Sequence, residues 1–424
     1  MPLDSSALRF RFAAPSDLDA AIRLAGHSFP GPARSPDWWR DQLDAPLYGG
    51  AIDETLFLGE ESGRVVAGCQ LHPMSQWIGG QALPVAGVGA VAVAPTHRRR
   101  RIAAQLMTAA MRAARERGDA ASILYPFRAS FYRNLGYGRA GEVLQYRVAP
   151  RALPVSDERL RVELLETDTG RAQALDVYSA WIPTQTGQLE RSARRWAYLC
   201  GMTDRLLVGY RADTGALEGY ALAAYRMGPP PDGRYLDVLE LLWTTPRARR
   251  GLYGWLASLD DQWERLLVRA LPEQRFGDLL ADARLPPAAA PSWELWEPAA
   301  TLLTGTMFRI LDMRRAWELR SLPSHASMLV SLAVVDAQIP ENARSWRLTL
   351  ADGRAAIDPE RPGTGSAVDL SIELDISTLS RLYIGSLPAT AAHDAGLLAC
   401  ERAELLPRLD AALALPQAWT FDRF

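Results

Sequence analysis

Residues 91–138 decide the fold of this chain, and they read VAVAPTHRRRRIAAQLMTAAMRAARERGDAASILYPFRASFYRNLGYG. The alternating run Val91-Ala92-Val93 predicts a strand that Pro95 ends. Farther along, Ser122-Ile123-Leu124 predicts a second, buried strand. A basic turn and a helical pattern lie between them, so the stretch forms a unit of strand, basic turn, helix and strand.

The middle of this stretch predicts a helix that begins in a cluster of arginines. Apolar residues recur on one helix face from about Arg99 to Arg117, Thr96 is placed to cap the helix and Gly118 ends it. The first turn carries Arg98 to Arg101, where free backbone N–H groups and the positive end of the helix dipole attract anions. Arginines alone fit a solvated cap or a nucleic-acid patch, but the strand before them favours a phosphate site.

Two motifs in this stretch resemble a known family. The string Val91-x-Val93-x-Pro95-x-x-Arg98-Arg99-Arg100-x-Ile102-Ala103 resembles the acetyl-CoA motif of the GNAT N-acetyltransferases. The string Phe131-Tyr132-x-x-x-Gly136-Tyr137 is similar to the segment that closes that fold. APTHRRR, YRNLGYG and the final Phe424 together resemble the Eis (enhanced intracellular survival) branch, over nearly all of the 424 residues but on weaker local matches.

The resemblance implies acetyl-CoA as the co-substrate and no metal. In the family the backbone of the strand binds the pantetheine arm and the thioester, which here means Val91, Ala92 and Val93. The pyrophosphate would be held by the turn and the start of the helix, at Arg98, Arg99, Arg100, Arg101, Ala103 and Ala104. One of these departs from the pattern, because Arg101 stands where the family has a glycine that lets the backbone close on the pyrophosphate.

The resemblance also implies two catalytic groups. Tyr132 would be the general acid toward the coenzyme A thiolate, since a phenol with a reference pKa near 10 keeps its proton at neutral pH. A packed aromatic is the plain alternative for Tyr132, and Tyr137 is interpreted as a core residue. The carboxylate of Phe424 would be the general base, although a chain end is more often frayed than functional.

The acceptor side of the site is less well defined by sequence. The resemblance assigns acceptor contacts to Phe29, Trp39, Ala90, Arg128 and Arg423. The Trp38-Trp39 pair also fits ordinary core packing beside a proline-rich break.

Charges at the acceptor side differ from those of family members that acetylate aminoglycosides. Those members hold polycations with acids, whereas the aligned positions here are Gly31, Arg128 and Arg423, with Asp422 remaining nearby. Replacing acids by arginines repels a polycation. The expected acceptor is therefore a small-molecule amine that is neutral, aromatic or acidic.

Composition excludes several classes of protein. The net charge of −2 argues against a general nucleic-acid or membrane-surface binder. Cys69, Cys200 and Cys400 are far apart, so neither a disulfide framework nor a zinc spacing is present, and a reduced cytoplasm is the expected location. The sequence has no secretory signal core, and no run reaches the roughly 18 apolar residues that a membrane span needs.

The whole chain is predicted to be α/β in three domains: tandem GNAT domains, the second degenerate, followed by a sterol-carrier-like α/β domain. We expect the boundaries to be 1–150, 151–322 and 323–424. In the first domain strands are expected at 8–12, 56–58, 65–71 and 86–93, with 143–148 completing the sheet.

The second domain is expected to repeat the pattern of the first. A helix at 169–181 precedes strands at 206–211, 217–226 and 235–243, and 306–312 is expected as the last strand of that domain. Thr245-Pro246-x-x-Arg249-Arg250-Gly251 echoes the basic turn of the first domain without its Val-x-Val strand, which favours a structural role.

The third domain is expected to have strands at 327–335, 345–350 and 367–374, with helices at 376–383 and 400–413. Residues 375–385 carry the resemblance to the sterol-carrier-like domain of the Eis branch, where this domain acts as a scaffold.

The function expected from these residues is direct, acetyl-CoA-dependent N-acetyl transfer to a small amine. An acyltransferase with another acyl group or an O-linked acceptor is an alternative. A binding or regulatory protein on an inactive GNAT scaffold is a second alternative, and Arg101 is the feature that supports it. The resemblance further implies a homo-oligomer, a hexamer in Eis relatives.

Overall fold

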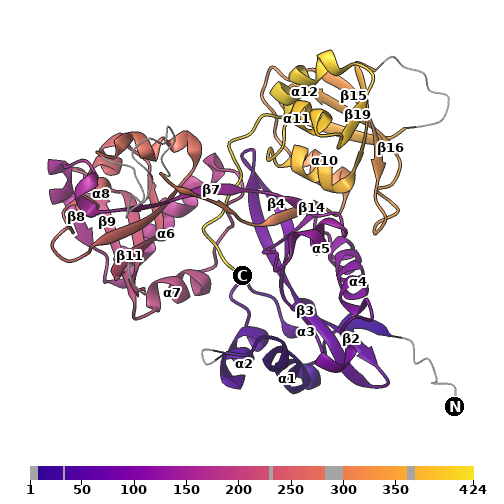
Figure 1. The fold of residues 1–424 in the computed structure, drawn as a ribbon, viewed down its shortest axis with the longest axis horizontal. Coiled ribbons are helices and arrows are strands. Elements are labelled where there is room, and N and C mark those ends of the chain that lie inside the picture. Colours follow the sequence, from indigo (N-terminus) through magenta and orange to yellow (C-terminus); the bar gives the residue numbers. More distant parts are fainter. Residues whose placement is uncertain (1–7, 32–33, 229–232, 282–298, 361–367) are drawn as a thin grey trace, which may run out of the picture. The chain divides into compact units, whose positions relative to one another are not determined.

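The computed structural model describes residues 8–31, 34–228, 233–281, 299–360 and 368–424 (Figure 1). Its contacts divide the chain into two compact units. Unit 1 comprises Met1–Gly141, Pro183–Ser192 and Thr306–Phe424, and unit 2 comprises Glu142–Ile182 and Ala193–Gly305. Both units are therefore built from segments that are separated in the sequence.

The first sheet of unit 1 has the strand order β1-β2-β3-β4-β5-β14-β6. Its strands are β1 (Arg9–Phe12), β2 (Leu56–Glu61), β3 (Arg64–Ile78), β4 (Gln81–Val93), β5 (Ala121–Leu124), β14 (Met307–Ile310) and β6 (Gly138–Arg139). β3 and β4 form a long hairpin, because Gly79 and Gly80 supply the positive φ angles of 57° and 80° that its tight turn needs. The hairpin is longer than the two strand runs that sequence predicts.

Helices cover both faces of this sheet. They are α1 (Leu18–Ser28), α2 (Pro36–Asp44), α3 (Ile52–Thr55), α4 (Ile102–Arg117) and α5 (Ala129–Arg133). Leu56 and Leu58 of β2 pack with α1 and α2, while Phe57 between them packs with α4. Because side chains alternate along a strand, α1 and α2 lie on one face of the sheet and α4 lies on the other.

β14 corrects one prediction. Residues 306–312 were expected to end the second domain, but Met307–Ile310 pair antiparallel with β5 and also with β6 in the first sheet. All four residues are buried, which suits a central strand. An apolar run of this length predicts a strand without saying which sheet it joins.

Unit 2 contains a sheet with the order β13-β7-β12-β11-β10-β9-β8. Its strands are β13 (Thr301–Thr304), β7 (Glu142–Val148), β12 (Arg265–Ala270), β11 (Arg234–Trp243), β10 (Leu217–Met227), β9 (Arg205–Arg211) and β8 (Val162–Leu164). Its helices are α6 (Asp168–Trp181), α7 (Ala193–Gly201) and α8 (Pro246–Ala257). The predicted helix and three strands of the second domain are confirmed, and α8 follows Thr245.

β7 corrects a second prediction, since residues 143–148 do not complete the first sheet. They lie between β12 and β13, with Tyr146 and Val148 buried in the core of unit 2. The chain thus supplies each of these two sheets with a strand from a segment that sequence assigns to the other domain. β7 and β14 pair with strands that lie far from them in the sequence. Local sequence patterns therefore do not show which sheet each of them joins.

The second sheet of unit 1 has the order β17-β16-β15-β18-β19. These strands are β17 (Arg354–Pro359), β16 (Ser345–Ala351), β15 (Met328–Val335), β18 (Leu370–Asp375) and β19 (Leu398–Cys400). The associated helices are α9 (Met313–Glu318), α10 (Ile376–Tyr383), α11 (Ala389–Asp394) and α12 (Leu406–Leu413). The expected strands and helices of the third domain are found, except that residue 367 lies outside the described residues and the last helix begins later than residue 400.

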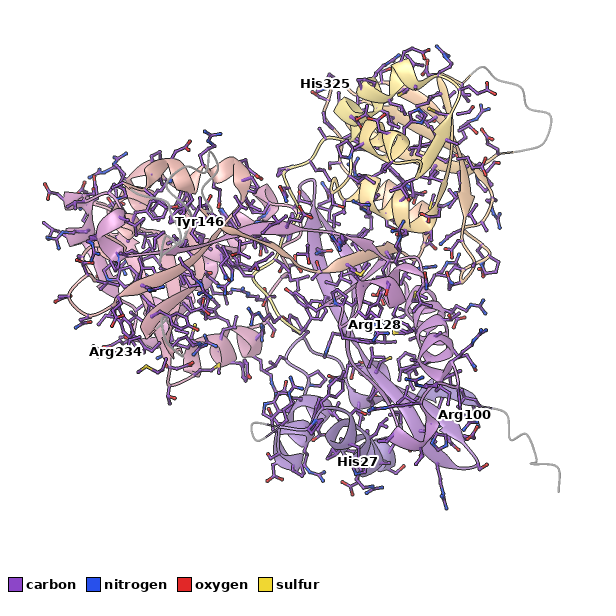
Figure 2. The ribbon with its side chains drawn as sticks, viewed as in Figure 1. His27, Arg100, Arg128, Tyr146, Arg234 and His325 are labelled. Carbon is purple, nitrogen blue, oxygen red and sulfur yellow. The ribbon has the colours of Figure 1, made fainter. Side chains whose placement is uncertain are left out.

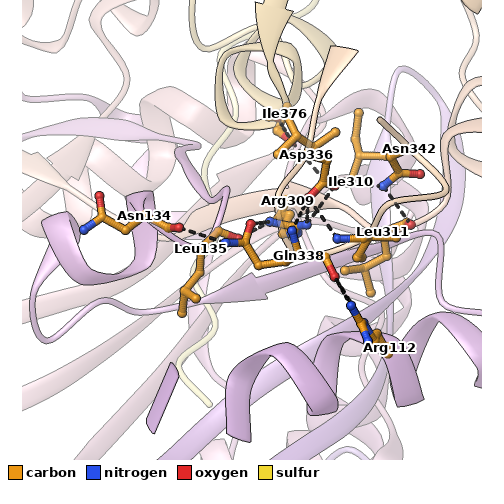
Figure 3. Close-up of polar contacts among 12 residues, drawn as sticks. Arg112, Asn134, Leu135, Arg309, Ile310, Leu311, Asp336, Gln338, Asn342 and Ile376 are labelled. Atoms are coloured by element: carbon orange, nitrogen blue, oxygen red, sulfur yellow. Dashed lines mark hydrogen bonds and ion pairs between the residues drawn. The ribbon is translucent and has the colours of Figure 1, made fainter. Parts of the chain in front are cut away.

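A buried polar network connects β14 to the sheet of β15 (Figure 3). The guanidinium of Arg309 donates to both carboxylate oxygens of Asp336 at 2.7 and 2.9 Å, and both side chains are fully buried. Arg309 also donates to the carbonyl of Leu135, and Asn342 donates to Asp336 at 3.1 Å. Because the carboxylate of Asp336 faces the guanidinium of Arg309, burying the charge is compensated and the two sheets of unit 1 are held together.

Across the stretches that the structure describes, no helix has the length and the apolar character that crossing a membrane requires.

Candidate active site

β4 carries a bulge close to its carboxyl end. Ala90 has a positive φ of 47°, and the pairing with β3 shifts register between Gly68 and Gln70. Ala90 and Val91 therefore oppose Cys69 alone, and the backbone turns there. Such bulges re-aim strand groups, so the peptide groups after Ala90 point differently from those before it.

β4 also leaves its neighbour at this point. Its parallel pairing with β5 covers Val85–Val88 and Ala121–Leu124, whereas β4 itself continues to Val93. The backbone beyond Val88 thus runs along an open edge that faces the β5 side. Val91, Ala92 and Val93, which sequence assigns to the thioester end of acetyl-CoA, all lie on this edge.

The basic turn after β4 has a backbone conformation that arginine rarely adopts. Arg99 and Arg101 have φ angles of 62° and 60°. Arg101 is the N-cap of α4, which begins at Ile102. Thr96 does not cap the helix as expected, because its hydroxyl lies 2.8 Å from the ring of His97 instead. Arg101 therefore keeps the left-handed geometry that a glycine would supply.

The arginines of the turn differ in their contacts. All four side chains, Arg98 to Arg101, are exposed. Arg100 also binds the carboxylate of Glu61 at 2.6 and 3.1 Å, and this bond lowers the pKa of Glu61. In Figure 2 the side chain of Arg100 lies apart from Arg128. Arg100 is thus held at the end of β2.

The start of α4 fits a pyrophosphate. The first-turn N–H groups of Ile102 and Ala103 have no preceding helical turn to donate to, and the helix is 16 residues long. Its positive dipole end and the exposed Arg98, Arg99 and Arg101, which Glu61 does not bind, favour an anion. With the open edge of β4 leading to this helix end, the residues present match the requirements of coenzyme A.

Tyr132 lies on α5 with only 3% of its surface exposed. Its ring packs edge-on against Tyr137 and Phe131, at 6.0 and 5.0 Å between centroids. Burial raises the pKa of Tyr132 well above its ordinary value, and the nearby Tyr137 and Cys69 add to this. Tyr132 shares its apolar cluster with Val91, so the phenol and the β4 edge lie on the same face of the sheet.

Phe424 lies against β4 just before the bulge. A Cβ atom added to Gly87 would meet the Phe424 ring at 3.3 Å, and one added to Gly89 would meet the carboxyl carbon of Phe424 at 3.7 Å. Tyr48 and Tyr125 pack around the ring, at centroid distances of 6.2 and 5.5 Å. The two glycines let the chain end approach the strand closely.

Three of the predicted acceptor residues come together. Trp39 is 4% exposed in a cluster that Phe29 and Ala90 join, and the rings of Trp39 and Phe29 are 5.7 Å apart. Trp39 is therefore core packing and also a neighbour of the bulge. Its indole N–H is buried without a hydrogen-bond partner among the described residues.

The other acceptor residues lie on the surface. Arg128 is the exposed N-cap residue of α5, and Arg423 is exposed in the chain's last segment. Gly31 is also exposed, and a Cβ atom there would meet nothing within 4 Å. None of these three positions offers an acid that could hold a polycation.

Tyr132, Phe424, Phe29 and Trp39 all lie near residues 87–93 of β4. Tyr132 lies on one face with Val91 and Val93, while Phe29 and Trp39 approach Ala90 from the other face. Ala90, at the bulge, lies on the face of Phe29 and Trp39, and the next residue, Val91, lies on the face of Tyr132.

Sequence reasoning missed several residues here. His72 on β3 is 6% exposed, and its Nε2 would lie 3.4 Å from a Cβ at Gly89. Tyr48, Tyr125 and Arg191 contact the last three residues of the chain. The alternation of glycines at Gly87 and Gly89 is the signal that could have indicated a close approach at this strand.

Within the part of the chain that the structure describes, no three His, Cys, Asp or Glu side chains gather as a metal ion would require.

Comparisons with protein families match three regions of the chain. The family of GNAT acetyltransferase domains matches residues 9–140, and a second family with the same description matches residues 187–310. The family of sterol carrier protein domains matches residues 313–420. The order of these matches confirms the fold expected from sequence, two GNAT domains followed by a sterol-carrier-like domain.

Individual relatives carry the same class of name. An uncharacterized N-acetyltransferase of Streptomyces avermitilis is 26% identical over 354 residues, and N-acetyltransferase Eis of Mycobacterium tuberculosis is 28% identical over 341 residues. Each alignment covers 78% of this chain and 78% of the relative. Among solved structures, a GCN5-related N-acetyltransferase from Anabaena variabilis shares the fold with a TM-score of 0.82 at 20% identity, covering 99% of this chain and 100% of the other.

Proposed function

We propose that this chain, which its GNAT domains and its relatives support as an Eis-type GNAT N-acetyltransferase, transfers an acetyl group directly from acetyl-CoA to an amine of a small molecule. The observation that carries the proposal is the meeting of cofactor, catalytic and acceptor residues along Gly87–Val93. Support for the enzyme class comes from the GNAT domains and the N-acetyltransferase relatives.

Acetyl-CoA supplies an activated acetyl thioester when it binds. The backbone of Val91 to Val93 would orient it along the open edge of β4, and the start of α4 would hold its pyrophosphate with Arg98, Arg99 and Arg101. Arg100 contributes less than sequence suggests, because Glu61 already neutralises it.

Two groups would move protons. The amine must lose a proton as its nitrogen forms the new bond to the acetyl carbon, and the carboxylate of Phe424 lies beside Gly89 where it can accept that proton. The carbon–sulfur bond breaks as this bond forms. The phenol of Tyr132, which burial keeps protonated, would donate to the departing sulfur.

The acceptor is proposed to be neutral, aromatic or acidic. Phe29 and Trp39 offer aromatic surface beside Ala90, and Trp39 has a buried N–H to donate. Arg128 and Arg423 would repel a polycation. We further propose that the enzyme acts in the cytoplasm as a homo-oligomer, a hexamer by likeness to the family.

Titration calorimetry with acetyl-CoA, on the native chain and on Arg101→Gly, tests the cofactor part of the proposal. We expect binding by both proteins, because Arg101 already has the backbone geometry of glycine and an exposed side chain. Binding by Arg101→Gly alone would mean that the arginine closes the site, and the alternative of a non-catalytic binding protein would then be favoured.

An acceptor panel tests the rest. Aryl amines, amino acids and aminoglycosides would be compared by coenzyme A release. Efficient repeated acetylation of aminoglycosides would contradict the acceptor class, while turnover only with hydroxyl acceptors or longer acyl-CoA would favour the acyltransferase alternative.

A further inference from the structure

Two segments meet at the end of the chain beside β4, and no motif singled out the first of them. One is residues 183–192, here called the insert, and the other is residues 418–424, here called the tail. The insert pairs with β3: the N–H of Trp77 donates to Gln188, the N–H of Gly187 donates to Trp77 and the N–H of Glu190 donates to Ser75, at 2.7–2.9 Å. The insert therefore behaves as a short extra strand of unit 1.

The tail lies directly on the insert. The N–H of Trp419 donates to the carbonyl of Thr186 at 3.0 Å, and the N–H of Phe421 lies 3.3 Å from the amide oxygen of Gln188. A Cβ atom on Gly187, whose φ is 98°, would come within 2.5 Å of the Trp419 carbonyl. Only glycine fits at this position, so the tail has one well-defined path.

The strongest contact between the two segments is an ion pair without solvent access. Nε of Arg191 lies 2.9 Å from a carboxylate oxygen of Asp422, and both side chains are 0% exposed. The hydroxyl of Tyr48 donates to the other carboxylate oxygen at 3.1 Å. The hydroxyl of Tyr125 donates to the backbone carbonyl of Asp422 at 2.6 Å.

Phe424 follows Asp422 by two residues, so whatever fixes Asp422 also fixes where the carboxyl group of Phe424 lies. We propose that Arg191, acting through Asp422, is the positioning residue for that carboxyl group. The inference rests on the proposed function, because it concerns the group proposed as the base. The insert would thus help to position the proposed base, although the boundaries expected from sequence put the insert in the second domain.

The carboxyl group of Phe424 must be placed accurately if it is to act as the base. A general base must lie within hydrogen-bond reach of the proton that it takes, and a shift of about 1 Å can cost about 100-fold in rate. A two-residue extension is short enough to transmit the position of Asp422 and too short to correct it. The carboxylate of Asp422 itself is occupied by Arg191 and Tyr48, so Asp422 serves as an anchor.

The test compares Arg191→Met, Asp422→Asn and Tyr48→Phe with the native chain. Arg314→Met is the matched control, because Arg314 forms an ion pair with Asp358 in which the side chains are 53% and 71% exposed. For each protein we would measure kcat, KM, the affinity for acetyl-CoA and the rate at which a carboxypeptidase releases Phe424. Tyr48→Phe removes one hydroxyl only and remains informative if the charge variants do not fold.

Arg191→Met and Asp422→Asn are expected to lower kcat about 100-fold with acetyl-CoA affinity within about twofold of native, because the base moves while the coenzyme site stays. Tyr48→Phe is expected to lower kcat about 3- to 10-fold. Phe424 should be released faster from all three variants. Added acetate should restore part of the lost rate in Arg191→Met, which a purely structural role of Arg191 would not produce.

Unchanged kcat in folded Arg191→Met, or in Tyr48→Phe where the charge variants fail to fold, would overturn the inference. So would losses in kcat that acetate does not relieve and that parallel a loss of acetyl-CoA affinity. If the native chain acetylates no acceptor, the proposed function fails, and the release of Phe424 still decides whether Arg191 holds the tail: release no faster than from Arg314→Met would overturn that part too.

Discussion

At the scale of single residues, the turn before α4 has an arginine in the left-handed backbone conformation that usually favours glycine. Arg101 has a φ of 60° and occupies the N-cap position of α4, with an exposed side chain that makes no capping hydrogen bond. A non-glycine residue in this region costs roughly 1 kcal/mol or more. The turn adopts its left-handed backbone at a cost in stability, which a substitution can measure.

Arg101→Gly should raise the free energy of unfolding or leave it unchanged, because relief of the left-handed strain offsets the entropy that glycine loses, each about 1 kcal/mol. The control is Gln105→Gly, at an exposed position inside α4, which should cost about 1 kcal/mol. Denaturant melts of both variants provide the measurement. Equal losses in the two variants would contradict the strain argument.

Gly89 offers a way to fill the space beside the proposed base. An added Cβ would lie 3.4 Å from Nε2 of His72 and 3.7 Å from the Phe424 carboxyl carbon, which are ordinary contact distances. Gly89→Ala should therefore stay within about 1 kcal/mol of native stability while kcat falls about 10-fold or more.

The control for Gly89→Ala is Gly201→Ala, where an added Cβ meets nothing within 4 Å. Both melts and kcat values would be compared. Native turnover in Gly89→Ala would show that the reacting amine does not pass this point.

Tyr132 gives a prediction about pH. Burial raises its pKa, so the folded state favours the neutral phenol, and the stability gained from this is present below about pH 10 and lost as the pH rises through the raised value. The proton of Tyr132 should stay available up to about pH 10. Profiles of kcat against pH for native enzyme and Tyr132→Phe would check this, with Tyr132→Phe slower by about 100-fold or more. An alkaline decline near pH 8 to 9 that disappears in Tyr132→Phe would refute it.

At the scale of elements, β14 is both a strand of the first sheet and an anchor for the next one. Arg309 of this strand donates to Leu135, three residues after Tyr132, and to Asp336 beyond β15. Ser377 of α10 donates to the carbonyl of Tyr137 at 2.9 Å. Hydrogen bonds from Arg309 and Ser377 therefore connect the sterol-carrier-like domain to the turn that follows Tyr132, the proposed acid.

Asp336→Ala should lower the free energy of unfolding by roughly 3–5 kcal/mol, because it leaves the guanidinium of Arg309 buried without its counter-charge. Asp358→Ala breaks the exposed pair with Arg314 and should cost less than about 1 kcal/mol. Guanidinium melts of the two variants form the comparison. A similar small shift in both would mean that the network around Arg309 contributes little.

The strand and helix around the proposed cofactor site could be predicted because their residues are contiguous, while their binding of acetyl-CoA stays a prediction. Val91 to Ala104 carry the strand, turn and helix start in one local pattern. β7 and β14 were assigned to the wrong sheets, because their partners are chosen by packing between distant segments. The ion pair between Arg191 and Asp422 could not be predicted from sequence for the same reason, since the two residues are 231 positions apart.

At the scale of the whole molecule, the strand exchange means that residues 1–150 do not contain a complete first sheet. β5 and β6 both lie beside β14, which comes from residues 307–310. The boundaries expected from sequence stay a prediction that truncation can test.

A chain that ends at residue 150 should fail to unfold cooperatively or to bind acetyl-CoA, because β14 and the buried Arg309 are missing. Residues 1–141, 183–192 and 306–424 joined by flexible linkers restore β14 and keep the insert, and this chain should recover a cooperative melt. Calorimetry and thermal melts would compare the two chains. Native-like binding by the shorter chain would show that β14 is dispensable.

Because β14 belongs to the first sheet, the order of synthesis on the ribosome decides when that sheet can be completed. At about 5–20 residues per second, roughly 10 to 30 s pass between the emergence of residue 141 and that of residue 310. During that interval the edge of β5 waits without its antiparallel neighbour, while the sheet of unit 2 is completed first. The nascent chain thus finishes its second domain before its first, and the waiting edge is where a chaperone would be needed.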